Sequence, residues 1–520
     1  MSPWAPWSPE AFARARAQGK PVLATVGPLP HEALKAAEGE ISRRFIAVLA
    51  DPASRPDAAA RIGAGHAVVL GSDGARRAVL PLPAPDLSAV LARLADEAEA
   101  LDAGRPDGPA GPVWTGAVRE KPMAAAPDAA RIAGVFAALP ALTAPSEGVL
   151  EALLYAASER GGEPATAALT RGLGDLLDRS WDPARKAFRP AAASPLAVHA
   201  RRARLLWDAH ALGGEARWRD AAEAATRVLQ HDLFDPGAGA LRAAPGAAVY
   251  PADGNALAAL ALLRASAFGV SGAESCAAKA LAFLQSRLYD PLLGLVHAQG
   301  GDGESVHGLL GDAAWTALAS TEAFLATGIR QHREFADGLL RFMFQELWER
   351  DGGGFLDRVP RADDPLILRE TRVDPEPNAV ALEVCWRLHH LKGSANYRRW
   401  LDWGLRGAWP AAGEDPARLA GLARAADMAS RPRLDFELIG RPGETRAAAL
   451  LAALRRRCLP RAIVSFVDPD DQDYILAHKL TAHSYPRLFG CGSDLRRLAD
   501  AEEPGQVGAV VDAVRTAESL

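Results

Sequence analysis

Carboxylate side chains stand at the start of three Ala-rich segments in the middle of the sequence. Asp253, Asp312 and Glu376 each follow a long loop and precede residues typical of a helix. Two carboxyl groups held roughly 5–10 Å apart can hydrolyse a glycosidic bond, one as the acid and the other as base or nucleophile. We therefore predict these three residues as catalytic candidates, provided that the fold brings them together.

The elements that would position these carboxylates form a repeat. An aromatic residue followed by a turn recurs four times, at spacings of 53, 55 and 59 residues. Each unit holds two helical segments, one that runs into the turn and one that opens after a loop. The four turns are Trp181-Asp182-Pro183, Phe234-Asp235-Pro236, Tyr289-Asp290-Pro291 and Trp348-Glu349-Arg350.

The length of the repeat decides between helical architectures. A unit of about 55 residues is longer than a tetratricopeptide or ankyrin repeat. We predict an (α/α) toroid of five or six helical hairpins over residues 128–432. Equivalent positions in a closed ring point to the same end of its axis, so the candidate carboxylates should converge there. An open solenoid of helix pairs is the alternative.

Residues 1–103 interleave strand-like and helix-like segments. Lys20–Gly27 is a compact apolar run that is typical of a buried strand. Leu87–Leu101 has the pattern of an amphipathic helix, and Ser8 is a predicted N-cap for a helix over Pro9–Gln18. This alternation predicts a small α/β domain.

The sequence changes character twice more. Residues 104–127 are rich in Gly, Pro and Ala, which predicts a linker. Residues 433–520 begin with a strand–helix–strand pattern, which predicts a small α/β segment with a parallel pair of strands. Its predicted elements are Phe436–Gly440, Thr445–Cys458, Ala462–Val467 and a last helix over Gln506–Ala517.

Composition excludes several classes of function. The net charge of −5 and the scattered Lys and Arg residues favour neither nucleic acid nor an anionic membrane. The chain has no long apolar stretch and no signal-peptide pattern, so we expect a cytoplasmic protein. Its four cysteines are widely separated, so we predict no redox pair, no metal site and no cofactor.

Two stretches of the sequence carry a resemblance to a known family. The first is Trp4–Phe12 with Lys20–Leu23, and the second is Gly353–Phe355 with Leu366–Arg369 and Asp374–Asn378. The chain resembles the spermatogenesis-associated protein 20-like proteins. That resemblance implies a thioredoxin-like domain over residues 1–103, followed by a six-hairpin glycosidase-like toroid.

The chain departs from this family where redox chemistry would occur. The family has a Cys-His-x-Cys-His motif after its first strand, whereas here Pro28–Ala33 contain no cysteine. The family's Gly-Trp-Pro element is replaced by Gly65-His66-Ala67. Thiol–disulfide exchange requires a reactive thiolate and a second thiol. We therefore predict a degenerate thioredoxin-like domain without this activity.

The resemblance also implies where a ligand would bind. In six-hairpin enzymes, carboxylates at the starts of inner helices face a central cavity, where aromatic residues stack on sugars and amides bind hydroxyl groups. On this basis the predicted ligand-binding residues are Tyr250, Asn255, His307, Trp315, Phe355, Asp374 and Asn378.

Asp and Asn at helix starts also serve as N-caps, so each candidate residue has a purely structural alternative. Three hypotheses for the function of the chain remain. The first hypothesis is a protein that binds a carbohydrate-like or other polar ligand in the toroid mouth without catalysis. The second is a carbohydrate-active enzyme, a hydrolase or an epimerase. The third, a thiol oxidoreductase, conflicts with the missing cysteines.

Overall fold

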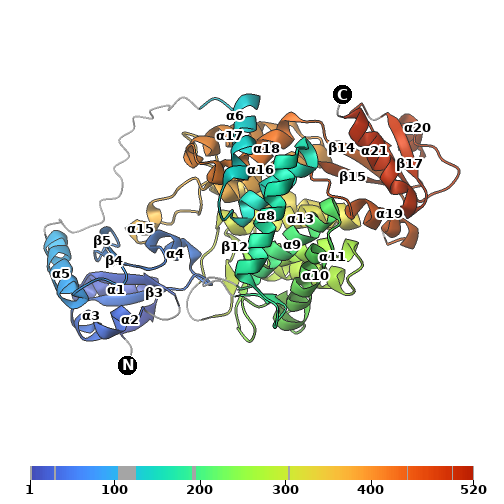
Figure 1. Ribbon diagram of the computed structural model, residues 1–520. Helices are drawn as coiled ribbons and strands as arrows, with labels where there is room; N and C mark the ends of the chain where they lie inside the picture. Colours follow the sequence, from blue (N-terminus) through green and yellow to red (C-terminus); the bar gives the residue numbers. More distant parts are fainter. Residues whose placement is uncertain are drawn as a thin grey trace.

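The computed structural model describes residues 3–27, 31–103, 124–189, 195–301, 305–441, 443–494 and 496–518. Two sheet-containing units flank a ring of helices (Figure 1). We call them the N-terminal unit, the helical ring and the C-terminal unit. Most of the predicted linker, residues 104–123, lies outside the described residues, and so do Pro28–Pro30.

The N-terminal unit is a five-stranded sheet between two layers of helices. Its strand order is β1-β3-β2-β4-β5, with β1 and β2 parallel to β3, and β4 and β5 antiparallel to their neighbours. The strands are β1 (Trp4–Pro6), β2 (Val22–Val26), β3 (Ile46–Ala50), β4 (His66–Leu70) and β5 (Arg76–Pro81). The helices are α1 (Pro9–Gln18), α2 (Glu32–Ala36), α3 (Glu38–Arg44), α4 (Pro56–Ile62) and α5 (Leu87–Ala103).

Alternation along the strands explains this layering. Val22 and Ala24 of β2 pack with α1 and α4, whereas Leu23 packs with α2, α3 and α5 on the opposite face. The Ser8 hydroxyl accepts a hydrogen bond from the Ala11 backbone N–H, which confirms the predicted cap of α1.

The helical ring is closed. Within the described residues, six inner helices pack in sequence, and the last packs back against the first; an outer helix packs against each. The inner helices are α7 (Glu147–Tyr155), α9 (Pro195–Gly213), α11 (Ala252–Ala267), α13 (Leu310–Thr327), α16 (Pro375–Lys392) and α18 (Pro416–Ser430). The outer helices are α8 (Glu163–Ser180), α10 (Ala216–Arg227), α12 (Ala273–Phe283), α14 (Arg330–Glu346), α17 (Ala395–Ala412) and α6 (Ala129–Ala138). This arrangement confirms the predicted toroid over the open solenoid.

The composition of the helices matches their places in the ring. Inner helices such as α11 and α13 are buried on almost every side, and their many Ala residues allow close packing. The outer helix α14 buries one face only. The ring core also includes short π-helical ends after α7, α10 and α12, over Ala156–Arg160, Val228–Leu233 and Leu284–Leu288.

The four repeated aromatic turns follow the outer helices α8, α10, α12 and α14, and the first three are two-stranded hairpins. In three of them the Asp carboxylate accepts hydrogen bonds from the backbone of the turn, as Asp290 does from Leu292 and Leu293. These hairpins pair β6 (Trp181–Asp182) with β7 (Ala187–Phe188), β8 (Phe234–Asp235) with β9 (Ala240–Leu241), and β11 (Tyr289–Asp290) with β12 (Gly294–Leu295). The fourth turn closes through a single bridge between Trp348 and Phe355. The turns are therefore structural, and each leads to the start of an inner helix.

The C-terminal unit is a four-stranded sheet of order β15-β14-β16-β17. Its strands β14 (Leu434–Ile439) and β15 (Ala462–Val467) are parallel and joined by α19 (Thr445–Arg455), which confirms the predicted strand–helix–strand pattern. The antiparallel strands were not predicted. The remaining elements are β16 (Arg487–Cys491), β17 (Arg497–Ala501), α20 (Gln472–Ala477) and α21 (Val507–Ala517).

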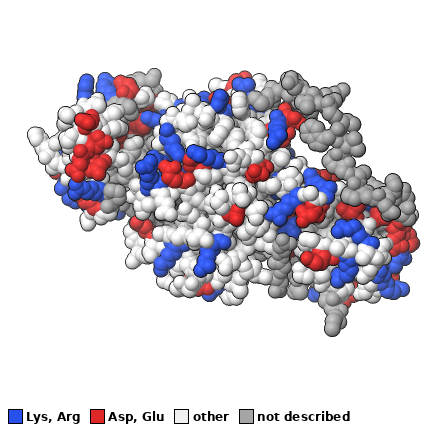
Figure 2. Space-filling view, turned by 180° about the vertical axis from the view of Figure 1, so that it is seen from behind, with Lys and Arg blue, Asp and Glu red and all other residues white. Residues whose placement is uncertain are grey.

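The C-terminal unit covers the end of the ring where the inner helices finish. Arg456 donates to the Ala267 carbonyl oxygen at the end of α11, at 2.7 Å. Phe324 and Leu325 of α13 join the apolar core of this unit. Side chains of both charges are interspersed over the face shown in Figure 2. None of the described helices is both long and apolar enough to cross a bilayer.

Candidate functional site

The inner helices begin around a cavity of about 400 Å³, which we call the mouth cavity. The carboxylates predicted from the repeat meet here: Asp253 is the second residue of α11, Asp312 the third of α13 and Glu376 the second of α16. Trp315 and Asp374 also line the cavity, as predicted. The structure thus gathers five of the ten candidate residues around one space.

Asp253, His297 and Asp312 form a cluster on one wall of the mouth cavity. His297 lies in the loop before α13, and its Nδ1 is 2.9 and 3.0 Å from the two carboxylate oxygens of Asp312. One polar atom of each of the three residues lies within 4.8 Å of those of the other two. His297 and Asp312 direct their polar atoms at each other, so we describe the cluster as an acid–base group rather than a metal centre.

Exposure differs within this cluster. His297 and Asp312 are 3% and 2% exposed, whereas Asp253 is half-buried and accepts a hydrogen bond from the Gly254 N–H at 2.6 Å. A Cβ at Gly254 would approach the Leu196 side chain of α9 to within 2.8 Å, so a larger residue there would displace that side chain. Asp253 is therefore the member of the cluster that a ligand can reach most directly.

The buried pair is ionised at neutral pH. Burial opposes the charged form of His297, but the adjacent Asp312 carboxylate outweighs it and raises the pKa of the imidazole to about 9. Burial raises the pKa of Asp312 to about 6, although the His297 charge and hydrogen bond act in the opposite direction. Between these two values an imidazolium faces a carboxylate.

Glu376, which also lines the mouth cavity, has a cationic partner. Its carboxylate lies 2.5 Å from an Arg201 guanidinium nitrogen, and Arg201 also binds Glu151 at 2.9 Å. The same guanidinium lies over the Trp315 ring, 5.3 Å from its centre. Asp374 accepts a hydrogen bond from the Glu376 N–H at 3.3 Å and caps α16. Glu376 and Asp374 thus already have structural roles.

Five predicted ligand-binding residues do not line the mouth cavity. Asn255 is fully buried and hydrogen-bonds both backbone groups of Leu241, and Asn378 does the same with Phe355. These amides hold two of the four turns against the inner helices that follow them, so their similar positions reflect the repeat. Phe355 itself is fully buried among Phe344 and Trp348.

The other two residues lie near the hairpins. The Tyr250 hydroxyl donates to the Asp235 carboxylate at 2.6 Å, and His307 pairs with Val296 in an isolated bridge. Aromatic and amide side chains near helix starts therefore serve the fold here, which the sequence pattern alone did not distinguish from ligand binding.

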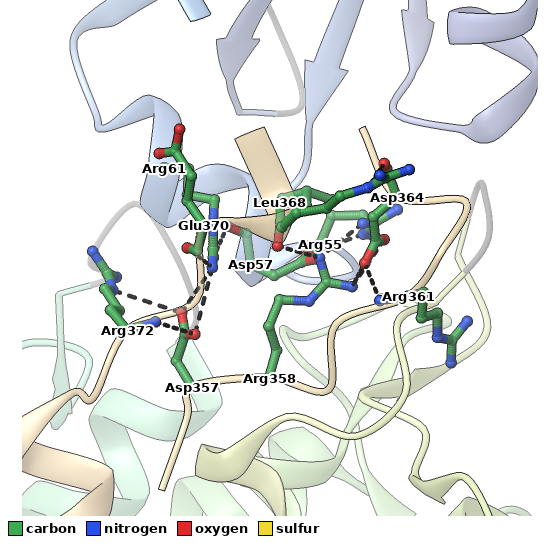
Figure 3. A network of polar contacts seen from close by, with 11 residues as sticks. Arg55, Asp57, Arg61, Asp357, Arg358, Arg361, Asp364, Leu368, Glu370 and Arg372 are labelled. Atoms are coloured by element: carbon green, nitrogen blue, oxygen red, sulfur yellow. Dashed lines mark hydrogen bonds and ion pairs between the residues drawn. The ribbon is translucent and has the colours of Figure 1, made fainter. Parts of the chain in front are cut away.

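The N-terminal unit forms part of the mouth cavity. Pro56, Asp57, Ala60 and Arg61, all on α4, lie among its lining residues. Figure 3 shows Arg61 reaching across to the ring, where it donates to the Asp357 carboxylate at 3.1 Å and to the Glu370 carbonyl oxygen at 2.9 Å. The cavity is thus built from two parts of the chain that are far apart in sequence.

A second set of contacts fixes this arrangement. Arg358 of the ring is 1% exposed and lies between the Asp364 carboxylate, at 2.9 Å, and the Asp57 carboxylate, at 3.5 Å (Figure 3). Ile367 and Leu368, from the short helix α15 (Leu366–Arg369), are buried in the core of the N-terminal unit. One loop of the ring is therefore anchored inside that unit.

Sequence reasoning missed His297, Arg201 and the α4 residues. His297 is the histidine at this position of one repeat, where the next repeat has Asp357, and Arg201 is one of several arginines on α9. Arg61 reaches the cavity only because the N-terminal unit docks there. No local pattern identified these residues, since their roles depend on contacts between distant segments.

No protein-family model matches the chain, and no curated protein sequence matches it. Among solved structures, a family 76 glycoside hydrolase (mannosidase) from Bacteroides thetaiotaomicron VPI-5482 is 15% identical, covers 46% of this chain and 69% of its own, and has a TM-score of 0.38. The family 76 α-1,6-mannanase from Salegentibacter sp. HEL1_6 is 12% identical and has a TM-score of 0.42. The match covers 54% of this chain and 88% of the mannanase chain.

Cellobiose 2-epimerase from Spirochaeta thermophila DSM 6192 is 16% identical, covers 51% of this chain and 85% of its own, and has a TM-score of 0.38. At these values the likenesses assign no activity to this chain. The closed ring is shown by the packing of its own helices.

Proposed function

We propose that the chain is a carbohydrate-active enzyme whose mouth cavity binds a neutral, hydroxyl-rich ligand and whose chemical group is Asp253, His297 and Asp312. The observation that carries this proposal is the buried His297–Asp312 pair, which lies beside the more accessible Asp253 in that cavity. A buried pair with shifted pKa values next to a reachable carboxylate is typical of acid–base sites.

The charges of the lining favour a neutral ligand over a phosphorylated one. Among the described lining residues, seven carboxylates outnumber three arginines and one histidine. A phosphate group would be repelled by this excess, whereas carboxylates accept hydrogen bonds from sugar hydroxyls. Trp315, which is 8% exposed, offers part of an indole surface to the same space.

The three residues would divide the work. In this proposal Asp312 holds the His297 ring through Nδ1 and stabilises its charge, so that the imidazolium serves as the proton donor. Asp253 serves as the proton acceptor or nucleophile. Their polar atoms lie closer together than the 6.5–9.5 Å that an inverting hydrolase needs for its water. The spacing therefore favours a retaining hydrolase, or the removal and return of a proton on one sugar carbon.

A ligand-binding protein without catalysis is the second candidate. It is supported by the partners that the other carboxylates already have: Glu376 with Arg201, and Asp374 with the start of α16. If Asp253 only contacts hydroxyl groups, the cavity binds a sugar without transforming it.

We propose that the N-terminal unit is a degenerate thioredoxin-like domain that acts as a wall of the mouth cavity. Its strand order, with two parallel strands beside β3 and two antiparallel strands at the other edge, supports this assignment. The four cysteines lie in the other two units, and burial raises the pKa of Cys458 and of Cys491 to about 12. Such thiols are poor nucleophiles.

A panel experiment tests the proposed function. The full chain would be incubated with mannose, glucose, cellobiose, α-1,6-mannobiose and 4-nitrophenyl glycosides, with products separated by chromatography and binding measured by calorimetry. We expect a new sugar or a released nitrophenol, abolished in Asp253→Asn and retained in Asp220→Asn on the exposed side of α10. Binding without product supports the second candidate, and no binding contradicts both.

A further inference from the structure

A second cavity lies on the ring axis at the end where the inner helices finish. It has a volume of about 150 Å³, and residues from all six inner helices line it. The C-terminal unit supplies its cover through the end of α19, the loop that follows and β15. We call this space the inner chamber. By the volume of liquid water it would hold about five molecules.

The inner chamber carries an excess of positive charge. Its described lining contains six arginines and four carboxylates, a difference of two charges. The carboxylates are Glu151, Asp208, Glu322 and Glu383. The arginines are Arg204, Arg264, Arg387, Arg424, Arg455 and Arg457, of which Arg457 is exposed at the rim.

The four carboxylates of the chamber each have an arginine other than Arg204 and Arg455 as a close partner. Glu383 binds Arg387 at 2.9 Å and Arg424 at 2.7 Å, and Glu322 also binds Arg387 at 2.9 Å. The two remaining carboxylates have close partners as well, since Glu151 lies 2.9 Å from Arg201, outside the chamber, and Asp208 lies 2.6 Å from Arg264.

Among the described residues Arg204 has no close ion pair, although the four carboxylates of the chamber together outweigh its burial and raise the pKa of its guanidinium. The ion pair found for it, with Asp208, has a separation of 3.8 Å, and 22% of its side chain stays accessible on an inner helix that lines the chamber. The helix dipole does not stabilise the charge of Arg204. A dipole acts on cations within the last turn of a helix, and Arg204 lies nine residues before the end of α9.

Arg455 adds a second cation from the cover. It donates to the Leu263 carbonyl oxygen near the end of α11, a neutral partner. Burial lowers the pKa of its guanidinium to about 10, which shows that nearby acids do not offset the loss of hydration. A cation held in the interior without a full counter-charge is costly unless an anion accompanies it.

We propose that the inner chamber binds a small oxyanion, with Arg204 and Arg455 as its charge partners. A phosphate or a carboxylate would supply the missing negative charge and accept hydrogen bonds from the guanidinium groups. The rest of the wall is apolar, with Leu154, Leu260, Leu325 and Met428 among its residues. A carboxylate with a short hydrocarbon body fits this wall better than inorganic phosphate does.

Calorimetry on the full chain tests the proposal, with inorganic phosphate and butyrate as separate probes in an otherwise chloride-free, uncharged-buffer solution. We expect butyrate to bind more tightly than phosphate, and both to bind at least tenfold more weakly to Arg204→Gln. Tighter binding of phosphate would retain the oxyanion site but assign it to a phosphate group. Arg446→Gln, an exposed residue of α19 that does not line the inner chamber, is the matched control and should bind as the parent does.

A second measurement covers the case in which Arg204→Gln fails to fold. Crystals of the unaltered chain soaked in sodium bromide should show an anomalous peak beside Arg204. Equal affinity in Arg204→Gln and the parent, or an inner chamber that contains water alone after both soaking and titration, would overturn the proposal. The arginines would then serve only the ends of the helices.

Discussion

The two cavities on the ring axis differ in the sign of the charge that surrounds them. Carboxylates dominate the mouth cavity, whereas arginines dominate the inner chamber. All six inner helices end at the chamber and five of them begin at the mouth cavity, so the dipoles of these five add in the same direction. Acids at one end and arginines at the other suit this arrangement. Charge sign alone therefore does not identify a functional group.

A charged residue that only offsets a helix dipole can be distinguished from a functional one by whether it has a partner of opposite charge. In the mouth cavity, Glu376 has Arg201 and Asp374 caps its helix, but Asp253 stands beside a buried ion pair. In the inner chamber, Arg264, Arg387 and Arg424 have carboxylate partners at 2.6–2.9 Å. Arg204 has its ion pair at 3.8 Å, and Arg455 donates to a carbonyl oxygen. Asp253, Arg204 and Arg455 thus differ from their neighbours in the two cavities, since no close ion pair among the described residues engages them.

The largest effect is expected at Asp253. Replacing it with Asn keeps the size and removes the proton acceptor, so turnover of a sugar substrate should fall by about 10³-fold, within the range for acid–base groups. The melting temperature should stay within about 2 °C of the parent, because Asp253 is only half-buried. Initial rates at saturating substrate measure the effect. A change of KM alone would indicate a binding role.

The cover of the mouth cavity depends on buried ion pairs, and Arg358→Met tests them. This change leaves Asp364 without its guanidinium and leaves Asp57 with Arg55 alone, which should cost about 3 kcal/mol of stability. Calorimetric unfolding should show the N-terminal unit separating from the ring at a lower temperature. Arg350→Met, an exposed neighbour in sequence, is the control. An unchanged unfolding profile would mean that the apolar contacts of Ile367 and Leu368 hold the N-terminal unit against the ring.

Asn255 and Asn378 provide a comparison between repeats. Each amide bonds the backbone of one hairpin, so replacing either with Ala should leave buried backbone groups unsatisfied and cost about 2 kcal/mol. Denaturant titration should give similar losses for the two, and almost none for the exposed Asn396→Ala. Sugar affinity should not change at all. If either substitution lowered sugar affinity without lowering stability, the residue would have to be assigned to the ligand-binding site.

The smallest expected effect is a dependence of stability on pH. The folded-state pKa of His297, about 9, lies above its ordinary value near 6.5, so its charged form stabilises the fold. That stability is complete below about pH 6.5 and is lost as the pH rises through about 9. The melting temperature should fall across this window in the parent but less in His297→Gln. The exposed His231→Gln should retain the full dependence.

The sequence predicted the ring because each repeat carries its own local signals. The aromatic-Asp turns and the Ala-rich inner helices recur at a regular spacing, and their equivalence predicted that Asp253, Asp312 and Glu376 would meet. The same regularity misled the choice of Asn255 and Asn378. Equivalent positions thus include both structural amides and members of the chemical group, and the repeat alone does not distinguish Asn255 from Asp253.

Local sequence patterns did not predict the cavity residues that belong to the N-terminal and C-terminal units, because these residues reach the ring only where the units pack against it. Arg61 and Asp57 reach the mouth cavity through ion pairs between segments about 300 residues apart. Arg455 reaches the inner chamber from the C-terminal unit in the same way. Apolar periodicity predicts elements one at a time, but it does not predict which surfaces meet, so both covers of the ring had to be found in the structure.

The most direct test of the central claim is an NMR titration of the His297 ring in the full chain with labelled histidine, with and without the sugar panel. The account predicts a ring that is protonated at pH 7, loses its proton near pH 9 and shifts when a neutral sugar is added. A ring that is neutral at pH 7 and does not respond to any sugar of the panel would contradict it.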